Sequence, residues 1–120
     1  MKEQLPSAVH AYVQAINNHD ADAFLALFAD GAIVHDVGRE FQGLTEIADW
    51  SQREIFDVRV SLAVLGVVNR DSETIITAKC DGTFNRTGLP DPLILEHRVV
   101  VESGKIVALT CRLADGQACP

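Results

Sequence analysis

Three polar side chains stand where the surrounding pattern is apolar. Tyr12 shares a helical face with apolar neighbours, Asp36 closes the strand-like run 32–36, and Glu96 interrupts the apolar run 93–101. Moving a carboxylate out of water is costly unless the group is paired, hydrogen-bonded or protonated. A domain of this size has a net stability of only about 5–15 kcal/mol. Two acids and a phenol on apolar elements therefore indicate a wet or reactive pocket.

These residue types suit proton transfer next to a carbonyl group. Such a reaction needs a base close to the acidic carbon and hydrogen-bond donors for the enolate oxygen. Asp36 is the candidate base, and Tyr12 and a neutral Glu96 are the candidate donors. A carboxylic acid stays protonated at neutral pH only in an apolar site. The chain has no nucleotide, flavin or metal-binding motif, so we expect neither a cofactor nor a metal.

Each candidate also has an ordinary structural interpretation. Asp36 precedes a glycine turn that its side chain can cap, and a buried Tyr12 needs only one partner for its hydroxyl. Glu96 shares a strand face with Arg98, and the two can form a surface ion pair that leaves Glu96 ionised. His97 would then face the other side, either as a core histidine or as a base in the pocket. The alternation alone leaves both arrangements of this strand open.

The elements that must position these residues can be read from periodicity. Leu5, Val9, Tyr12 and Ile16 are spaced 4, 3 and 4, which predicts a helix over 6–17. Asp20 can cap a second helix that includes Phe24, Leu27 and Phe28, and a third helix holds Ile47, Trp50 and Ile55. Short strands are expected over 32–37 and from Val58 onward, with a loop between Gly38 and Gly43. Further strands are expected at 74–84, 94–101 and 105–113, the last two forming a hairpin.

Helices followed by consecutive strands predict an α+β fold. We expect three N-terminal helices packed on a strongly curved, mostly antiparallel sheet that encloses a conical cavity. Gly66 and Gly82 lie inside strand patterns, where bulges or bends would curve the sheet. The 120 residues suffice for one domain, 1–120, with 114–120 as a loose C-terminal tail.

Composition excludes several classes of function. Hydrophobic residues make up 48% of the chain and charged residues 22%, which is typical of a globular protein. The net charge of −7, without a basic cluster, argues against nucleic-acid binding. No apolar stretch reaches the roughly 20 residues that span a membrane, and the N-terminal segment lacks a signal-peptide pattern, so we expect a cytoplasmic protein. Of the three cysteines, Cys80 and Cys111 are expected in the core and Cys119 as an exposed thiol.

The segments 12–20 and 25–32 together resemble the opening of the nuclear transport factor 2-like superfamily. The helix around Trp50, the segment Phe41-Gln42-Gly43 and the ending 96–107 extend the resemblance from about Val9 to Leu113. This superfamily includes SnoaL-like polyketide cyclases and ketosteroid isomerases, and it implies the curved sheet and cavity described above. Because one fold hosts unrelated chemistries, the resemblance is more specific for fold than for function.

Within that superfamily, the ketosteroid isomerase pattern is the most similar. It implies that Asp36 is the general base and that Tyr12 and Glu96 bind the substrate oxygen, although the family has Asp where this chain has Glu96. The other side chains expected to contact the substrate are Val34, Trp50, Phe84 and His97.

The sequence thus predicts a cofactor-independent isomerase or cyclase acting on a small apolar carbonyl compound. A non-catalytic ligand-binding or dimerising module is the first alternative. A dehydratase or epoxide-opening enzyme that uses His97 or His35 is the second alternative. A His97 side chain that points into the cavity would favour this second alternative over the isomerase. Exposed sheet surface is commonly covered by another copy, so we also expect a homodimer.

Overall fold

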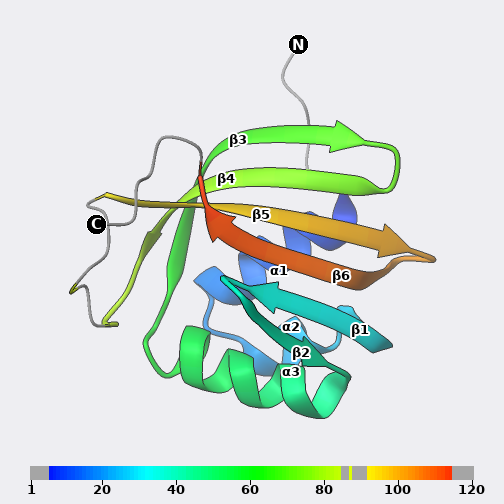
Figure 1. The fold of residues 1–120 in the computed structure, drawn as a ribbon, viewed down its shortest axis with the longest axis horizontal. Coiled ribbons are helices and arrows are strands. Elements are labelled where there is room, and N and C mark those ends of the chain that lie inside the picture. Colours follow the sequence, from blue (N-terminus) through cyan, green and yellow to red (C-terminus); the bar gives the residue numbers. More distant parts are fainter. Residues whose placement is uncertain (1–5, 85–86, 88–91, 115–120) are drawn as a thin grey trace.

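The computed structural model describes residues 6–84, 87 and 92–114. Its helical elements are α1 (Ser7–Asn17), α2 (Ala21–Leu25), α3 (Leu44–Ser51) and a π-helix, η1 (Gln52–Phe56). Its strands are β1 (Phe28–Asp36), β2 (Arg39–Gln42), β3 (Ser61–Arg70), β4 (Glu73–Asp81), β5 (Leu93–Glu102) and β6 (Lys105–Leu113) (Figure 1).

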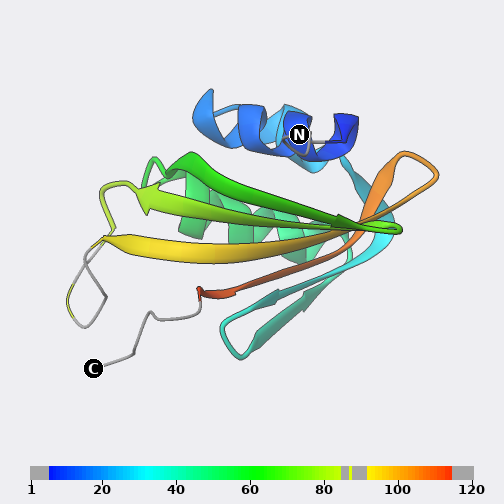
Figure 2. The same ribbon diagram turned by 90° about the horizontal axis from the view of Figure 1, so that it is seen from above.

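The strands form one open sheet in the order β2-β1-β6-β5-β4-β3. All neighbouring pairs are antiparallel except β1 and β6, which run parallel. Helix α1 packs against β3 at one end of the sheet, whereas α3 packs against β1 and β2 at the other. Figure 2 shows α1 lying along one side of the curved strands. The expected α+β fold, with helices on a curved mixed sheet, is confirmed.

The predicted apolar stripe of the first helix is buried at its described positions, and Leu5 lies outside the described residues. Val9, Tyr12 and Ile16 are each at most 1% exposed, because this face of α1 points toward the sheet. The predicted cap of the second helix is also present, since Asp20 accepts a hydrogen bond from the backbone N–H of Ala23 at 3.1 Å.

Two expected strand boundaries were wrong by three residues, since the strand expected from Val58 begins at Ser61 and the strand expected over 74–84 ends at Asp81.

Two larger differences involve strand pairing. Phe28 begins β1 instead of ending the second helix, because its backbone pairs with Ile106 of β6. The segment expected as a loop between Gly38 and Gly43 contains β2, which pairs antiparallel with β1 through a tight turn. Val37 and Gly38 have φ values of +45° and +84° in that turn. Both differences arise from pairing between strands, which local periodicity does not encode.

The sheet carries the predicted irregularity at Gly66, whereas Gly82 lies beyond the end of β4 at Asp81. The β3–β4 register shifts between Val64 and Gly66, and this bulge leaves Leu65 60% exposed. Bulges increase local twist and bend the strand. Cys80 and Cys111 are buried, as expected. Cys119, the tail at 115–120 and most of the loop at 85–92 lie outside the described residues.

Within the described ranges, no helix has the length and hydropathy needed to cross a bilayer.

Candidate active site

A cavity of about 360 Å³ lies between the sheet and the helical layer. Ligand pockets in proteins span roughly 300–1,000 Å³, so this one suits a small molecule. Its apolar wall comes from Ile16, Val37, Ile55, Val60, Leu62, Phe84, Leu93, Leu95 and Leu113. Its polar, aromatic and thiol side chains are Tyr12, Asp36, Arg39, Trp50, Glu54, Cys80, His97 and Cys111.

Asp36 stands at the end of β1, where its carboxylate lines the cavity. The indole Nε1–H of Trp50 donates to Asp36 Oδ2 at 3.0 Å, and Arg39 Nη2 donates to the same oxygen at 2.7 Å. Trp50 comes from α3, so this contact joins the helix to the sheet. Within the described part of the chain, Asp36 Oδ2 accepts both of these hydrogen bonds. The other carboxylate oxygen, Oδ1, can therefore accept a hydrogen bond or a proton from a bound molecule.

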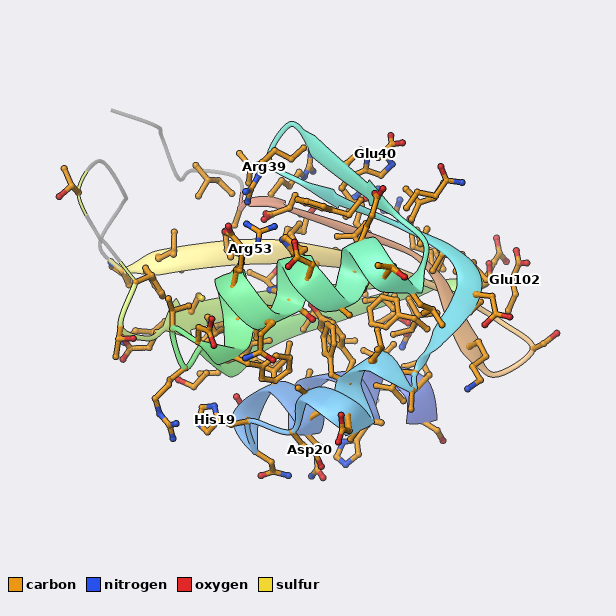
Figure 3. The ribbon with its side chains drawn as sticks, turned by 90° about the horizontal axis from the view of Figure 1, so that it is seen from below. His19, Asp20, Arg39, Glu40, Arg53 and Glu102 are labelled. Carbon is orange, nitrogen blue, oxygen red and sulfur yellow. The ribbon has the colours of Figure 1, made fainter. Side chains whose placement is uncertain are left out.

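Arg39 links the β1–β2 turn to the π-helix. Its guanidinium donates to both carboxylate oxygens of Glu54, each at 3.2 Å, besides its contact with Asp36. This hydrogen bonding with Glu54 raises the pKa of Arg39 and lowers the pKa of Glu54. Figure 3 shows Arg39 on the β1–β2 hairpin, on the same side of the molecule as Arg53. The ion pairs place a charged rim beside the apolar wall, and π-helical segments such as η1 often occur at functional sites.

A second cluster of polar side chains comes from α1, β5 and β6 and is more buried than Asp36 and Arg39. The Tyr12 hydroxyl is 2.8 Å from His97 Nδ1, and Cys111 Sγ is 3.6 Å from the same nitrogen. The three side chains are almost fully buried, at 1%, 4% and 6% exposure for Tyr12, His97 and Cys111. Burial lowers the pKa of His97 to about 4, so its imidazole is neutral at pH 7. Burial also raises the pKa of Tyr12 and of the Cys111 thiol, so both keep their protons.

The strand register connects the two polar groups. Asp36 pairs with Cys111 across β1 and β6, and Cys111 pairs with His97 across β6 and β5. These three residues form one row on the same face of the sheet. Adjacent strands are about 4.8 Å apart, so Asp36 and His97 are separated by roughly 10 Å of sheet. After burial itself and Cys111, the Asp36 charge also raises the pKa of Tyr12, which agrees with their facing one cavity.

Glu96 lies outside this cavity. Arg112 Nε donates to Glu96 Oε1 at 2.9 Å, and Arg98 Nε donates to the same oxygen at 3.2 Å. Partial burial raises the pKa of Glu96, but the hydrogen bonds from Arg112 and Arg98 outweigh it, so the pKa lies below its ordinary value. The expected position of Glu96 in the pocket was therefore wrong, and the ion-pair alternative holds. His97, on the opposite face of β5, occupies the cavity wall instead.

The other expected contact residues divide into two groups. Trp50, Phe84 and His97 line the cavity, whereas Val34 is completely buried in the core and contributes nothing to the cavity wall. Periodicity did not indicate the site positions of Cys111 and Glu54. For β5, one signal was present. One alternating face carries the three charged residues Glu96, Arg98 and Glu102, whereas the other carries only His97 among apolar side chains. The apolar face is the one that turns inward.

The described residues contain no group of three or more His, Cys, Asp or Glu side chains arranged to hold a metal ion.

Comparison with known families gives one match over most of the chain. The model of the SnoaL-like domain matches residues 9–109. A comparison with curated proteins finds no match.

Solved structures share this architecture. A candidate polyketide cyclase from Sinorhizobium meliloti is 26% identical, with a TM-score of 0.80 over 90% of this chain and 95% of the other. A hypothetical protein from Catenulispora acidiphila with a ketosteroid isomerase-like fold, solved with trimethylamine, is 18% identical, with a TM-score of 0.77 over 95% and 90%. The Δ5-3-ketosteroid isomerase from a Mycobacterium species is 17% identical, with a TM-score of 0.72 over 90% and 91%. At these lower identities, the likeness concerns the fold.

Proposed function

This chain belongs to the SnoaL-like domain family, and from that premise we propose that it transfers a proton next to the carbonyl group of a small apolar compound. The observation that carries the proposal is the pairing of Asp36 and Tyr12 in one apolar cavity. A base and a donor held by different elements around one small volume are what enolisation requires.

In this reaction Asp36 is the base. One carboxylate oxygen takes the proton from the carbon next to the carbonyl. The electron pair of that C–H bond forms the C=C bond of the enolate, and the π pair of the carbonyl moves onto its oxygen. Trp50 and Arg39 hold the other oxygen and orient the carboxylate. The protonated Asp36 then returns its proton to a carbon of the same substrate. With a β,γ-unsaturated ketone, the product is the conjugated enone.

Tyr12 is the partner of the developing oxyanion. Its raised pKa keeps the phenol protonated at neutral pH, so it donates a hydrogen bond without losing its proton. Such a donor in a water-poor site stabilises the enolate more than it stabilises the ketone. Because Glu96 lies outside the cavity, it has no part in this mechanism.

Proton exchange on a simple ketone tests the proposal, because the chemistry at the α-carbon does not depend on the rest of the substrate. We would incubate the protein with 2-tetralone, a bicyclic ketone, in D₂O and follow loss of the α-proton signals by NMR. In parallel, a 5-ene-3-ketosteroid would report isomerisation through ultraviolet absorbance of the enone. Asp36→Asn should lower either rate by about 100-fold or more, since a general base contributes about 10²–10⁴. Exchange that is unchanged in a folded Asp36→Asn protein would remove Asp36 from the mechanism.

Dehydration is a second candidate, favoured by the inward position of His97. A dehydratase removes a proton and a hydroxyl from a β-hydroxy ketone, with an acid or base near the leaving group. The lowered pKa of His97 makes it a weak base at pH 7, which favours the first candidate. The test is formation of 2-cyclohexenone from 3-hydroxycyclohexanone. If this activity is lost in His97→Asn but retained in Asp36→Asn, dehydration becomes the favoured function in place of proton transfer by Asp36.

We also propose that the outer face of the sheet pairs with a second copy of the chain. That face carries the ion pairs of Glu96 with Arg98 and Arg112, next to the nearly buried Ile75. The exposed apolar surface continues onto β3, where Val68 pairs with Ile75 and is 44% exposed. Light scattering after size-exclusion chromatography should give twice the 13.0 kDa monomer mass. A monomer at every concentration would exclude the dimer.

A further inference from the structure

One polar atom of a cavity-lining side chain is buried without a partner in the described part of the chain. His97 Nε2 is buried and has no hydrogen-bond partner among residues 6–84, 87 and 92–114. The other ring nitrogen, Nδ1, lies 2.8 Å from the Tyr12 oxygen and 3.6 Å from Cys111 Sγ. The imidazole is neutral, so one of its two nitrogens carries a proton and the other carries a lone pair. Which nitrogen is protonated decides the direction of the hydrogen bond to Tyr12.

The two tautomers differ in what they leave unpaired. If Nε2 is protonated, a buried N–H has no acceptor, and Tyr12 must use its own proton on Nδ1. If Nδ1 is protonated, its N–H donates to the Tyr12 oxygen, and only a lone pair on Nε2 stays unpaired. Orphaned buried N–H groups are rarer in proteins than under-satisfied acceptors. The second tautomer therefore fits these surroundings better.

From this geometry we infer that His97 is a positioning residue that donates its Nδ1–H to Tyr12 and thereby directs the tyrosine proton to an acceptor oxygen in the cavity. The inference rests on the proposed function for the identity of that oxygen as a carbonyl or enolate. It also selects the ligand class, since a chain of donors running from His97 through Tyr12 ends on an acceptor. Hydrogen bonds in such a chain strengthen one another.

Cys111 leaves the tyrosine proton available. Its thiol lies beside His97 Nδ1, and thiol sulfur is a weak acceptor. A carbonyl oxygen entering the cavity is a stronger acceptor than sulfur and accepts the hydrogen bond of the Tyr12 O–H in preference to it. The tilted contact between Tyr12 and Phe24, with ring centroids 5.6 Å apart, fixes the phenol ring while its hydroxyl changes partner.

The tautomer can be measured directly, without an activity assay. In ¹⁵N-labelled protein at neutral pH, His97 Nδ1 should show the shift of a protonated ring nitrogen, and Nε2 that of an unprotonated one. The reverse assignment would overturn the inference. The folded wild-type protein suffices for this measurement, so it does not depend on any variant.

Ligand preference gives the second test, with 2-tetralone and tetralin as a matched pair that differs in the carbonyl oxygen. The wild-type protein should bind 2-tetralone about tenfold more tightly than tetralin, the ratio that one ordinary hydrogen bond supplies. Tyr12→Phe and His97→Leu should lose this preference. His97→Asn should retain most of it, because the asparagine amide places an N–H near the position of Nδ1. A folded His97→Leu protein that keeps the full preference would contradict the role of His97.

Failure of this inference is distinguishable from failure of the proposed function. Asp36-dependent exchange together with a protonated Nε2 would overturn only the role of His97. A protonated Nδ1 and a carbonyl preference without any exchange would support the role of His97 in binding while overturning the catalytic proposal.

Discussion

The burial of His97 predicts a specific loss of stability in mild acid. Its pKa is lowered to about 4 in the folded protein, against about 6.5 in an unfolded chain. Between these two values the unfolded state binds more protons than the folded state. The free energy of unfolding is therefore unaffected by His97 above about pH 6.5 and falls as the pH decreases toward 4. Below that, the contribution is constant.

The magnitude follows from the difference between the two pKa values. One pKa unit corresponds to about 1.4 kcal/mol, so the full shift of His97 is worth about 3 kcal/mol, of which about 2 kcal/mol is already lost near pH 5. This is a large fraction of the roughly 5–15 kcal/mol that holds such a domain together.

Urea denaturation over a range from about pH 7.5 to pH 4.5 measures the effect, with His97→Asn as the variant that does not titrate. The offset caused by the smaller side chain is independent of pH, and the carboxylates contribute equally to both proteins. The difference between the two unfolding free energies should therefore shrink by about 2 kcal/mol on going to pH 5. Parallel curves for wild type and His97→Asn would refute the reasoning.

Three further predictions concern single contacts. Glu96→Gln should leave α-proton exchange within about twofold of wild type, because Glu96 lies outside the cavity. It should cost about 1 kcal/mol in urea unfolding, since ion pairs with partly exposed guanidinium groups contribute little; a large loss of activity would place Glu96 in the catalytic site. Asn17→Ala should lower stability by about 1–3 kcal/mol, because the Asn17 amide pairs with both the N–H and the C=O of Leu62, at 2.7 and 3.1 Å, and the same unfolding titration checks this. Gly82→Ala should lower the free energy of unfolding by about 1–3 kcal/mol, because an added Cβ would lie 2.7 Å from the Val58 carbonyl oxygen. An unchanged midpoint in thermal or urea unfolding would show that the backbone relaxes there.

Much of the fold was predictable because its signals are local. The 4, 3, 4 spacing of apolar residues determined which face of the first helix is buried, and hence that Tyr12 points inward. The β5–β6 hairpin, with Gly104 at a φ of +79°, followed from alternation and turn chemistry. The bulge next to Gly66 also followed from the residue type. In each case a few consecutive residues carry the information.

The edge of the site was less predictable because it depends on pairing between distant segments. The strand β2 forms only because β1 offers it a partner, and the short run Arg39–Gln42 has no strong strand pattern of its own. Likewise, the contact of Arg39 with Glu54 needs the β1–β2 turn and the π-helix side by side. Neither segment predicts the other.

Strand alternation was enough to place Glu96 and His97 on opposite faces of β5, because successive side chains point to opposite sides of a sheet. Which of the two faces turns inward depends on how β5 packs against its neighbours. Arg98 and Arg112 hold Glu96 on the outer face, and Tyr12 of α1 meets His97 on the inner one. An ionised carboxylate is cheaper beside two guanidinium groups near water than in an apolar cavity, whereas a neutral imidazole can be buried. That difference in desolvation cost places a histidine, and not a carboxylic acid, beside the tyrosine of the site.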